Sequence, residues 1–200
     1  MYPLRIAFLW HKHQPCYQYD GEFLMPWVRL HGVKDYYDLP EVLHKFPQIR
    51  QTFNIVPSLH KQINEYINKD RYDKVQRLPL IEADKLTDDD KRDILKNFFL
   101  CNEQNLIQPY PRYWELFEKS RDHEEALRIF QPQDWRDLQV WYNLTWIGHF
   151  SRQTNFVKRY FEKGGDFSEN EKKLLMDHHT DILRKIVPQL SSLSKLGQAE

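Results

Sequence analysis

The 200-residue sequence has few cysteines, few glycines and no excess of charge of either sign. Cys16 and Cys101 are too few and too scattered for a disulfide framework or a cysteine-based zinc site, which is typical of a reducing compartment. The six glycines form no phosphate-binding loop, and we expect no cofactor. Lys and Arg number 29, as do Asp and Glu, so no overall basic field is available to hold nucleic acid or an anionic membrane.

Long hydrophobic runs are also missing. No apolar run approaches the ~20 residues that span a bilayer, and the N-terminus lacks the basic-then-apolar order of a signal peptide. We therefore expect a soluble, cytoplasmic protein with no nucleic-acid partner and no membrane partner, while the sequence leaves the oligomeric state open. Core residues are plentiful, since 40% of the chain is hydrophobic and 14% aromatic, which suits one domain over residues 1–200.

Two short apolar segments predict strands within residues 1–70. Leu4–Trp10 is a nearly continuous apolar run of the kind found in a strand buried on both faces, and Gln51–Val56 is a shorter candidate. Between them lie a predicted loop, Cys16–Arg29, and a helix-like stretch from Tyr36 to Phe46. This β-loop-α-β order favours an α/β fold, because adjacent parallel strands need a long crossover connection.

Helical signals dominate residues 71–200. Thr87 is placed to cap a helix, and Ser168 with Glu171 has capping-box spacing before another, longer one. Pro188 should kink or restart this long helix, and Gly197 should stop it. Shorter helices are predicted over residues 59–67, 113–117, 124–129 and 134–150.

Two strands do not make a parallel sheet with both faces covered. The sequence therefore looks incomplete at its C-terminus. The alternative without truncation is a mostly helical domain that carries a small β element.

Two histidines follow the first predicted strand. Alternate side chains of a strand share a face, so His11 and His13 should project together while Lys12 points away. Ligands of α/β folds bind at the carboxyl ends of strands. Imidazoles there can donate hydrogen bonds to hydroxyls, act as acid or base, or ligate a metal, and the spacing does not choose among these. The alternative is that one histidine bonds to a backbone carbonyl while the other faces solvent.

The segment His11-Lys12-His13-Gln14-Pro15 resembles the first signature of glycoside hydrolase family 57, the amylase and glucanotransferase group. Further segments resemble the large family members related to α-amylase: Pro26–His31, Lys34–Asp38, Thr52–Leu59 and Asp137–Leu144. Gly197–Glu200 resembles the opening of the second signature. The ordered set covers essentially the whole chain.

The resemblance implies that residues 1–200 are the N-terminal part of a catalytic domain, a seven-stranded (β/α) barrel cut off before its third strand. It implies a retaining, α-amylase-like reaction on α-glucans or maltooligosaccharides. The Glu nucleophile and the Asp acid/base would lie beyond residue 200, so this chain holds no catalytic residue and is expected to bind sugar without turnover. The implied substrate-binding residues are His11, His13, Gln14 and Glu200.

Other polar and aromatic residues are expected to have structural roles. Asp20, Glu22, Asp35 and Asp38 should solvate loops, cap helices or form surface pairs. Trp27 should pin its loop or stack on a glucose ring. The residues expected to pack in the core are Trp135, Trp141 and Trp146.

Two other functions stay open at this point. His11 and His13 could be ligands of a metal-dependent hydrolase, since His-x-His at a strand end suits zinc or another transition ion. No second cluster of ligand residues accompanies them in the sequence. The chain could also be a non-catalytic helical interaction domain whose exposed aromatic residues contact a protein partner.

Overall fold

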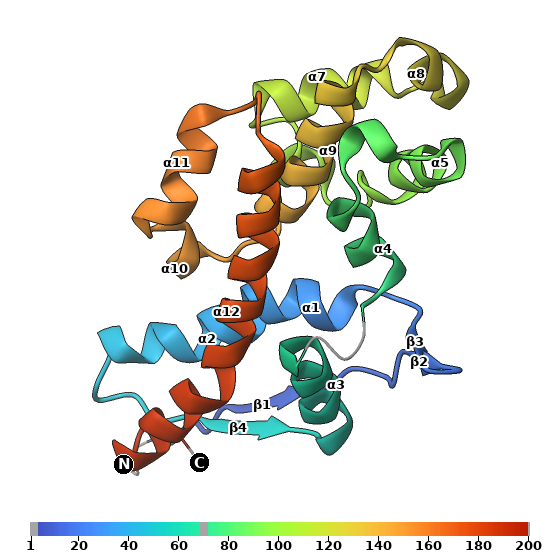
Figure 1. Ribbon diagram of the computed structural model, residues 1–200. Helices are drawn as coiled ribbons and strands as arrows, with labels where there is room; N and C mark the ends of the chain where they lie inside the picture. Colours follow the sequence, from blue (N-terminus) through green and yellow to red (C-terminus); the bar gives the residue numbers. More distant parts are fainter. Residues whose placement is uncertain (1–3, 69–71, 200) are drawn as a thin grey trace.

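The computed structural model describes residues 4–68 and 72–199. It is mostly helical, with a two-stranded parallel sheet at one end and a long helix, α12 (Glu169–Lys195), that runs between the sheet and the upper group of helices (Figure 1). Within these residues no helix is both long and apolar enough to cross a membrane.

The sheet consists of β1 (Leu9–Lys12) and β4 (Thr52–Ile55), which pair in parallel with His11 opposite Asn54. The helical crossover between them confirms the predicted β-loop-α-β order. Gln51 forms a further parallel bridge with Ala199, so the segment that follows α12 lies beside the amino end of β4.

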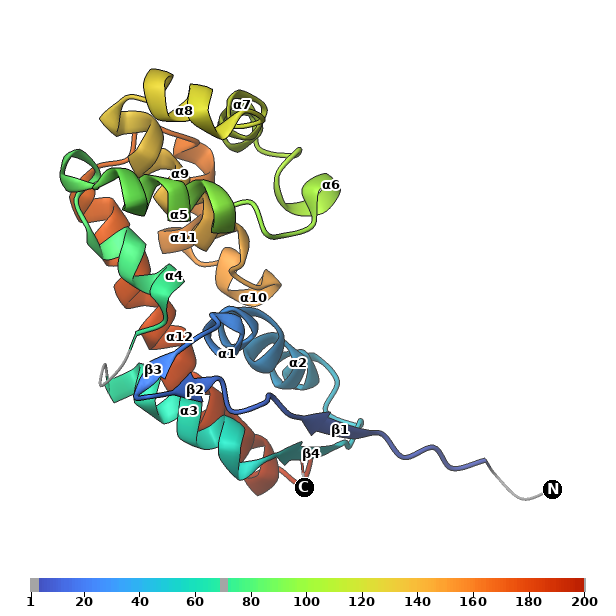
Figure 2. The same cartoon turned by 90° about the vertical axis from the view of Figure 1, so that its right-hand side faces the viewer.

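The prediction of a doubly buried strand over Leu4–Trp10 is wrong. β1 begins only at Leu9, and Leu4, Ile6 and Phe8 are 86%, 68% and 52% exposed. Figure 2 shows residues 4–8 running away from the body of the molecule. A strand is buried on both faces only where a sheet continues and layers cover it. The described residues supply β1 with one partner strand, and of its four residues only Lys12 is buried.

The predicted loop Cys16–Arg29 contains regular structure, so that prediction is wrong in part. β2 (Gln18–Tyr19) and β3 (Glu22–Phe23) form a short antiparallel hairpin. Asp20 and Gly21 make its turn with φ of 46° and 83°. An Asp-Gly pair favours such a turn, because both central residues need positive φ.

One continuous helical segment follows the hairpin. It is composed of α1 (Trp27–His31), the π-helix η1 (Gly32–Tyr36), α2 (Tyr37–Glu41) and the 3-10 helix η2 (Val42–Lys45). It starts earlier than the predicted 36–46 helix. Gly32 lets this segment lie close to α12, because a Cβ there would displace the end of the Leu183 side chain.

The remaining elements are helices. They are α3 (Pro57–Asn68), α4 (Lys74–Arg77), η3 (Leu78–Leu80), η4 (Ala83–Lys85), α5 (Asp88–Asn97), α6 (Glu103–Leu106), α7 (Pro111–Lys119), α8 (His123–Ile129), α9 (Pro132–Thr145), α10 (His149–Arg152) and α11 (Asn155–Lys163). Capping boxes at Thr87 and Ser168 confirm the predicted starts of α5 and α12.

One helix end differs from the prediction, and the restart expected at Pro188 does not occur. α9 ends at Thr145, not at Phe150, because Gly148 bonds through its N–H to the Val33 carbonyl and the chain turns into α10. α12 continues through Pro188 without a restart. The Arg184 carbonyl, which loses its helical donor there, belongs to an exposed residue and can bond to water. Gly197, with φ of 68°, stops the helix as predicted.

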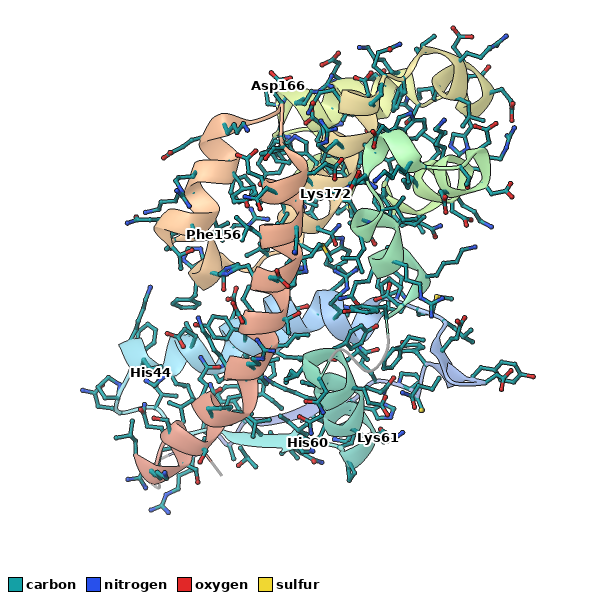
Figure 3. The ribbon with its side chains drawn as sticks, in the orientation of Figure 1. His44, His60, Lys61, Phe156, Asp166 and Lys172 are labelled. Carbon is teal, nitrogen blue, oxygen red and sulfur yellow. The ribbon has the colours of Figure 1, made fainter. Side chains whose placement is uncertain are left out.

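The core lies between α12 and the helices around it. Trp135, Trp141 and Trp146 are buried, as predicted. Polar side chains join the layers as well. Lys172 at the start of α12, labelled in Figure 3, is buried and donates to Gln139 Oε1 at 2.8 Å.

A buried polar network centres on Arg29 of α1. Its Nη1 is 2.9 Å from Asn143 Oδ1 of α9 and 3.1 Å from His179 Nδ1 of α12, while its Nε is 3.3 Å from Asp73 Oδ2. All four side chains are fully buried. Burial and the Arg29 charge hold the pKa of His179 well below its usual range. Arg29 and Asn143 therefore have structural roles and join three helices.

Candidate functional site

His11 and His13 lie side by side at the carboxyl end of β1. Their ring centroids are 5.8 Å apart with an interplanar angle of 21°, and both side chains are exposed. The prediction that they project together is confirmed. Strand alternation is the cause, because the two residues occupy the same face of the extended chain.

Lys12 points to the opposite face, as predicted. It is 5% exposed and donates from Nζ to the Tyr36 carbonyl oxygen at 3.0 Å. The ammonium also lies over the rings of Tyr36 and Phe53, at 5.6 and 5.1 Å from their centroids. Burial lowers the pKa of Lys12 to about 8, against a smaller opposing effect of the Asp35 charge.

Asn54 of β4 completes the exposed face beside the imidazoles. Its Nδ2 is 3.0 Å from His11 Nδ1. Sequence reasoning missed Asn54. Its position in the second predicted strand could have indicated it. When the two strands pair in parallel with their residues aligned, Asn54 lies opposite His11.

The loop after His13 is tied to two helices. Gln14 Nε2 donates to the Tyr36 hydroxyl at 2.9 Å, and its Oε1 accepts from the Tyr17 hydroxyl at 2.8 Å. Gln62 of α3 accepts from the Tyr17 backbone N–H and donates to the Pro15 carbonyl, both at 3.0 Å. The Gln14 amide is thus bonded at both ends by tyrosines and holds the strand end in place.

Glu200 lies outside the described residues. The two residues before it, Gln198 and Ala199, are buried, and the Gln198 amide donates to the Leu43 carbonyl at 3.1 Å. The backbone that leads to Glu200 is therefore packed against η2.

Asp35 forms surface pairs, as predicted. Its carboxylate is 2.6 Å from His31 Nδ1 and 3.8 Å from Lys34 Nζ. Burial alone would raise the pKa of Asp35, but the His31 hydrogen bond and the Lys34 charge outweigh it and lower the pKa. Asp35 is therefore a stable carboxylate at neutral pH. Glu22 likewise pairs with Arg77, at 2.9 Å.

Asp38 caps α10, as predicted. Its carboxylate accepts from the backbone N–H groups of His149 and Phe150. Burial raises the pKa of Asp38, and these two hydrogen bonds oppose the rise. A Cβ at Gly148 would overlap the Asp38 carboxylate, so the cap also requires glycine at that position.

Trp27 is the first residue of α1 and does not lie in the predicted loop, but the packing role expected of its ring is confirmed. Its half-buried ring packs at 6.1 Å from the Trp146 ring and at 6.4 Å from the His31 ring. The stacking of Trp27 on a sugar stays a prediction.

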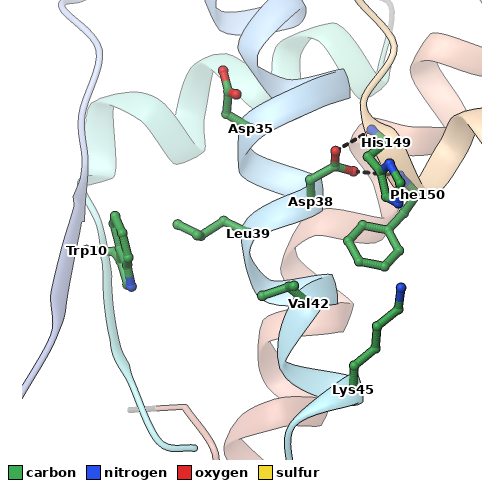
Figure 4. Close-up of a pocket in the computed structure, with 8 residues that line it drawn as sticks. All are labelled: Trp10, Asp35, Asp38, Leu39, Val42, Lys45, His149 and Phe150. Atoms are coloured by element: carbon green, nitrogen blue, oxygen red, sulfur yellow. Dashed lines mark hydrogen bonds between the residues drawn. The ribbon is translucent and has the colours of Figure 1, made fainter.

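A pocket of about 590 Å³ lies between β1 and α2, on the Lys12 side of the sheet. It is lined by Trp10, Asp35, Asp38, Leu39, Val42, Lys45, His149 and Phe150 (Figure 4). Neither His11 nor His13 lines it. The imidazole pair and this pocket are therefore separate features on the two sides of β1.

The residues that the structure describes contain no group of three or more His, Cys, Asp or Glu side chains that could hold a metal ion. The exposed face of His11, His13 and Asn54 offers hydrogen-bonding groups in place of a ligand cluster. Such a face suits a ligand that is rich in hydroxyl groups.

These features define a mixed helical and parallel-strand protein with a polar site at the carboxyl end of its sheet. The chain matches the family model described as glycosyl hydrolase family 57 over residues 7–200. It belongs to glycosyl hydrolase family 57, whose members act on glycans as glycosidases or transglycosylases. No curated protein and no solved structure matches the chain.

Proposed function

We propose that this chain supplies the substrate-positioning part of a retaining, α-amylase-like hydrolase or transglycosylase that acts on α-glucans. The observation that carries the proposal is the exposed pair of stacked imidazoles at the end of β1, 5.8 Å apart. Membership of family 57 supports it, because the family acts on glycans.

The chemistry of the pair suits a sugar. A neutral imidazole donates from one ring nitrogen and accepts at the other, as a hydroxyl does from its single oxygen. His11 and His13 would therefore bond to hydroxyls of one glucose residue next to the cleaved bond. Such bonds strengthen as the sugar ring distorts toward an oxocarbenium-like state. Gln14 would hold the strand end in place, and Glu200 would accept from the bound sugar.

We assign no catalytic role to Asp35 or Asp38. Retention of configuration requires two carboxyl groups about 5–5.5 Å apart across the scissile bond, one ionised and one protonated. Asp35 is bonded to His31 and Asp38 to the start of α10. The Glu nucleophile and the Asp acid/base are proposed to come from outside these 200 residues, and β1 and β4 to be the first two strands of a seven-stranded barrel.

The two alternative functions have less support. A metal-dependent hydrolase would need further ligands near His11 and His13, and the described part of the chain offers no cluster of three. A helical interaction domain would leave the paired imidazoles without a role. Metal analysis of the purified chain distinguishes the first alternative, which predicts one tightly held ion that is lost in His13→Ala.

The proposal is tested by titrating the chain with maltohexaose and following the histidine side chains by NMR. The resonances of His11 and His13 should shift on binding. His11→Ala and His13→Ala should each weaken binding roughly threefold to tenfold, the value of one net hydrogen bond. The matched control is His123→Ala on α8, at the other end of the molecule in Figure 1, which should bind as the wild type does.

Two results would contradict the proposal. Sugar binding that is unaffected by either His11→Ala or His13→Ala would remove the assigned site. Appreciable hydrolysis by this chain alone, abolished in His11→Ala, would show that the catalytic groups lie within it.

A further inference from the structure

We propose that Asn54 is a positioning residue that holds His11 in the tautomer with its proton on Nε2, so that His11 meets the substrate as a hydrogen-bond donor. The substrate half of this inference rests on the proposed glucan function. The tautomer half stands on the geometry of β1 and β4.

The hydrogen bond between the two strands fixes the proton. Asn54 Nδ2 lies 3.0 Å from His11 Nδ1, and an amide nitrogen can only donate. Nδ1 must then accept with its lone pair. A neutral imidazole carries a single proton, so that proton is on Nε2.

The backbone brings these two side chains together. His11 and Asn54 are register partners in the parallel pair, so their side chains leave the same face of the sheet at the same level. The His13 ring stacks against the His11 ring, with an interplanar angle of 21°. The His11 ring is thus held by a hydrogen bond at Nδ1 and by a neighbouring ring, and among the described residues no hydrogen bond engages Nε2.

The consequence is a defined polarity at the site. With Nδ1 occupied by Asn54, His11 offers an outward N–H and no outward acceptor. A sugar hydroxyl that meets His11 must accept through its oxygen, which leaves its own O–H to bond elsewhere. A substrate atom that can only donate would find no partner at this position.

The first experiment reads the tautomer directly. Long-range ¹H–¹⁵N NMR spectra of the chain, recorded at a pH where the imidazoles are neutral, distinguish Nε2–H from Nδ1–H in each histidine. The wild type should show Nε2–H at His11. Asn54→Asp has nearly the same shape and is exposed, so the fold should be kept, but a carboxylate only accepts. His11 should therefore move to Nδ1–H in this variant.

The chain provides a matched control. On α3, Asn64 Nδ2 lies 3.3 Å from Nε2 of His60, which is labelled in Figure 3. Asn64→Asp makes the same chemical change beside a different histidine. It should leave the His11 tautomer and the sugar affinity unchanged.

The second experiment measures affinity for maltohexaose. Asn54→Asp should weaken binding about tenfold, because the reversed tautomer presents an acceptor where the sugar needs a donor. Asn54→Ala removes the bond at Nδ1 without imposing the wrong tautomer, so it should weaken binding only about threefold. If Asn54 had a purely structural role, the opposite order would be expected, with Asn54→Ala losing more affinity for maltohexaose than Asn54→Asp.

The outcomes separate the two proposals. An Nδ1–H tautomer in the wild type, or no change of tautomer in Asn54→Asp, overturns the role of Asn54. A tautomer that reverses as expected in a chain that does not bind maltohexaose supports the hydrogen-bond lock and overturns the glucan function. Equal affinities of the wild type and Asn54→Asp, with the tautomer reversed, overturn the donor role of His11.

Discussion

Replacing Lys12 by methionine should stabilise the protein at neutral pH. The lysine is only 5% exposed, and its ammonium is held by one carbonyl and two aromatic rings instead of water. Burial lowers its pKa from 10.5 to about 8, so the folded protein carries an unfavourably placed charge at pH values near 7.

The magnitude follows from that pKa. A difference between 10.5 and about 8 corresponds to about 3 kcal/mol of destabilisation while Lys12 is charged. Methionine fills a similar volume without a charge but loses the hydrogen bond to the Tyr36 carbonyl, worth about 1 kcal/mol. The net gain of Lys12→Met at pH 7 should therefore be about 2 kcal/mol.

The pH dependence gives the sharper test. Between about 8 and 10.5 the unfolded chain retains the Lys12 proton and the folded chain releases it. Stability must then rise with pH across this interval, with the full penalty present below it and relieved above it. Lys12→Met lacks this rise, so its advantage over the wild type should disappear by about pH 10.5.

Urea denaturation of both proteins at several pH values from neutral to 10.5 measures this difference. Comparing the two proteins at the same pH cancels the titration of tyrosines and other groups. Lys96→Met, an exposed change on α5, should alter stability by less than about 0.5 kcal/mol at every pH. Wild-type and Lys12→Met curves that stay parallel, or a variant that is less stable at pH 7, would refute the reasoning.

Two further substitutions test how the scaffold is held. Arg29→Met should lower the free energy of unfolding by about 3–5 kcal/mol, because it leaves the buried Asp73 carboxylate without its cation. In urea denaturation, the double variant Arg29→Met/Asp73→Asn should recover part of this loss. No recovery would contradict the pairing. Gly148→Ala should lower the free energy of unfolding by about 1–3 kcal/mol, because the new methyl group would displace the Asp38 carboxylate from the start of α10. In an Asp38→Ala background the same substitution should cost clearly less. Equal costs in both backgrounds would exclude the overlap.

Local signals in the sequence predicted the helices well. Thr87 and Ser168 mark the starts of α5 and α12 because a hydroxyl and an acid three residues later satisfy the first backbone N–H groups whatever the surroundings. The Asp20-Gly21 turn was equally local, and its signal was present. The burial of Leu4–Trp10 was a different kind of inference. An apolar run shows that a strand has side chains suited to burial. Whether those side chains are buried depends on the neighbouring elements of the fold.

The site also contains some features that local sequence patterns predict and others that depend on tertiary packing. The common face of His11 and His13 follows from the two-residue period of a strand, which the sequence contains. The pairing of His11 with Asn54 follows from the register between segments more than 40 residues apart, which alternation within one strand does not determine. The ties of Gln14 to Tyr36 and Tyr17 likewise depend on how η1 packs against the strand end.

The position of Lys12 and the exposure of the imidazoles are two consequences of one register. A shift of β1 by one residue would exchange its faces, releasing the Lys12 ammonium to water but turning His11 and His13 under the helices. It would also take Trp10 Nε1 from Gln51 Oε1, to which it donates at 2.7 Å. The destabilising lysine therefore accompanies the outward histidine pair. Lys12→Met should keep the register, so it should raise stability while leaving the Nε2–H tautomer of His11 and the affinity for maltohexaose unchanged.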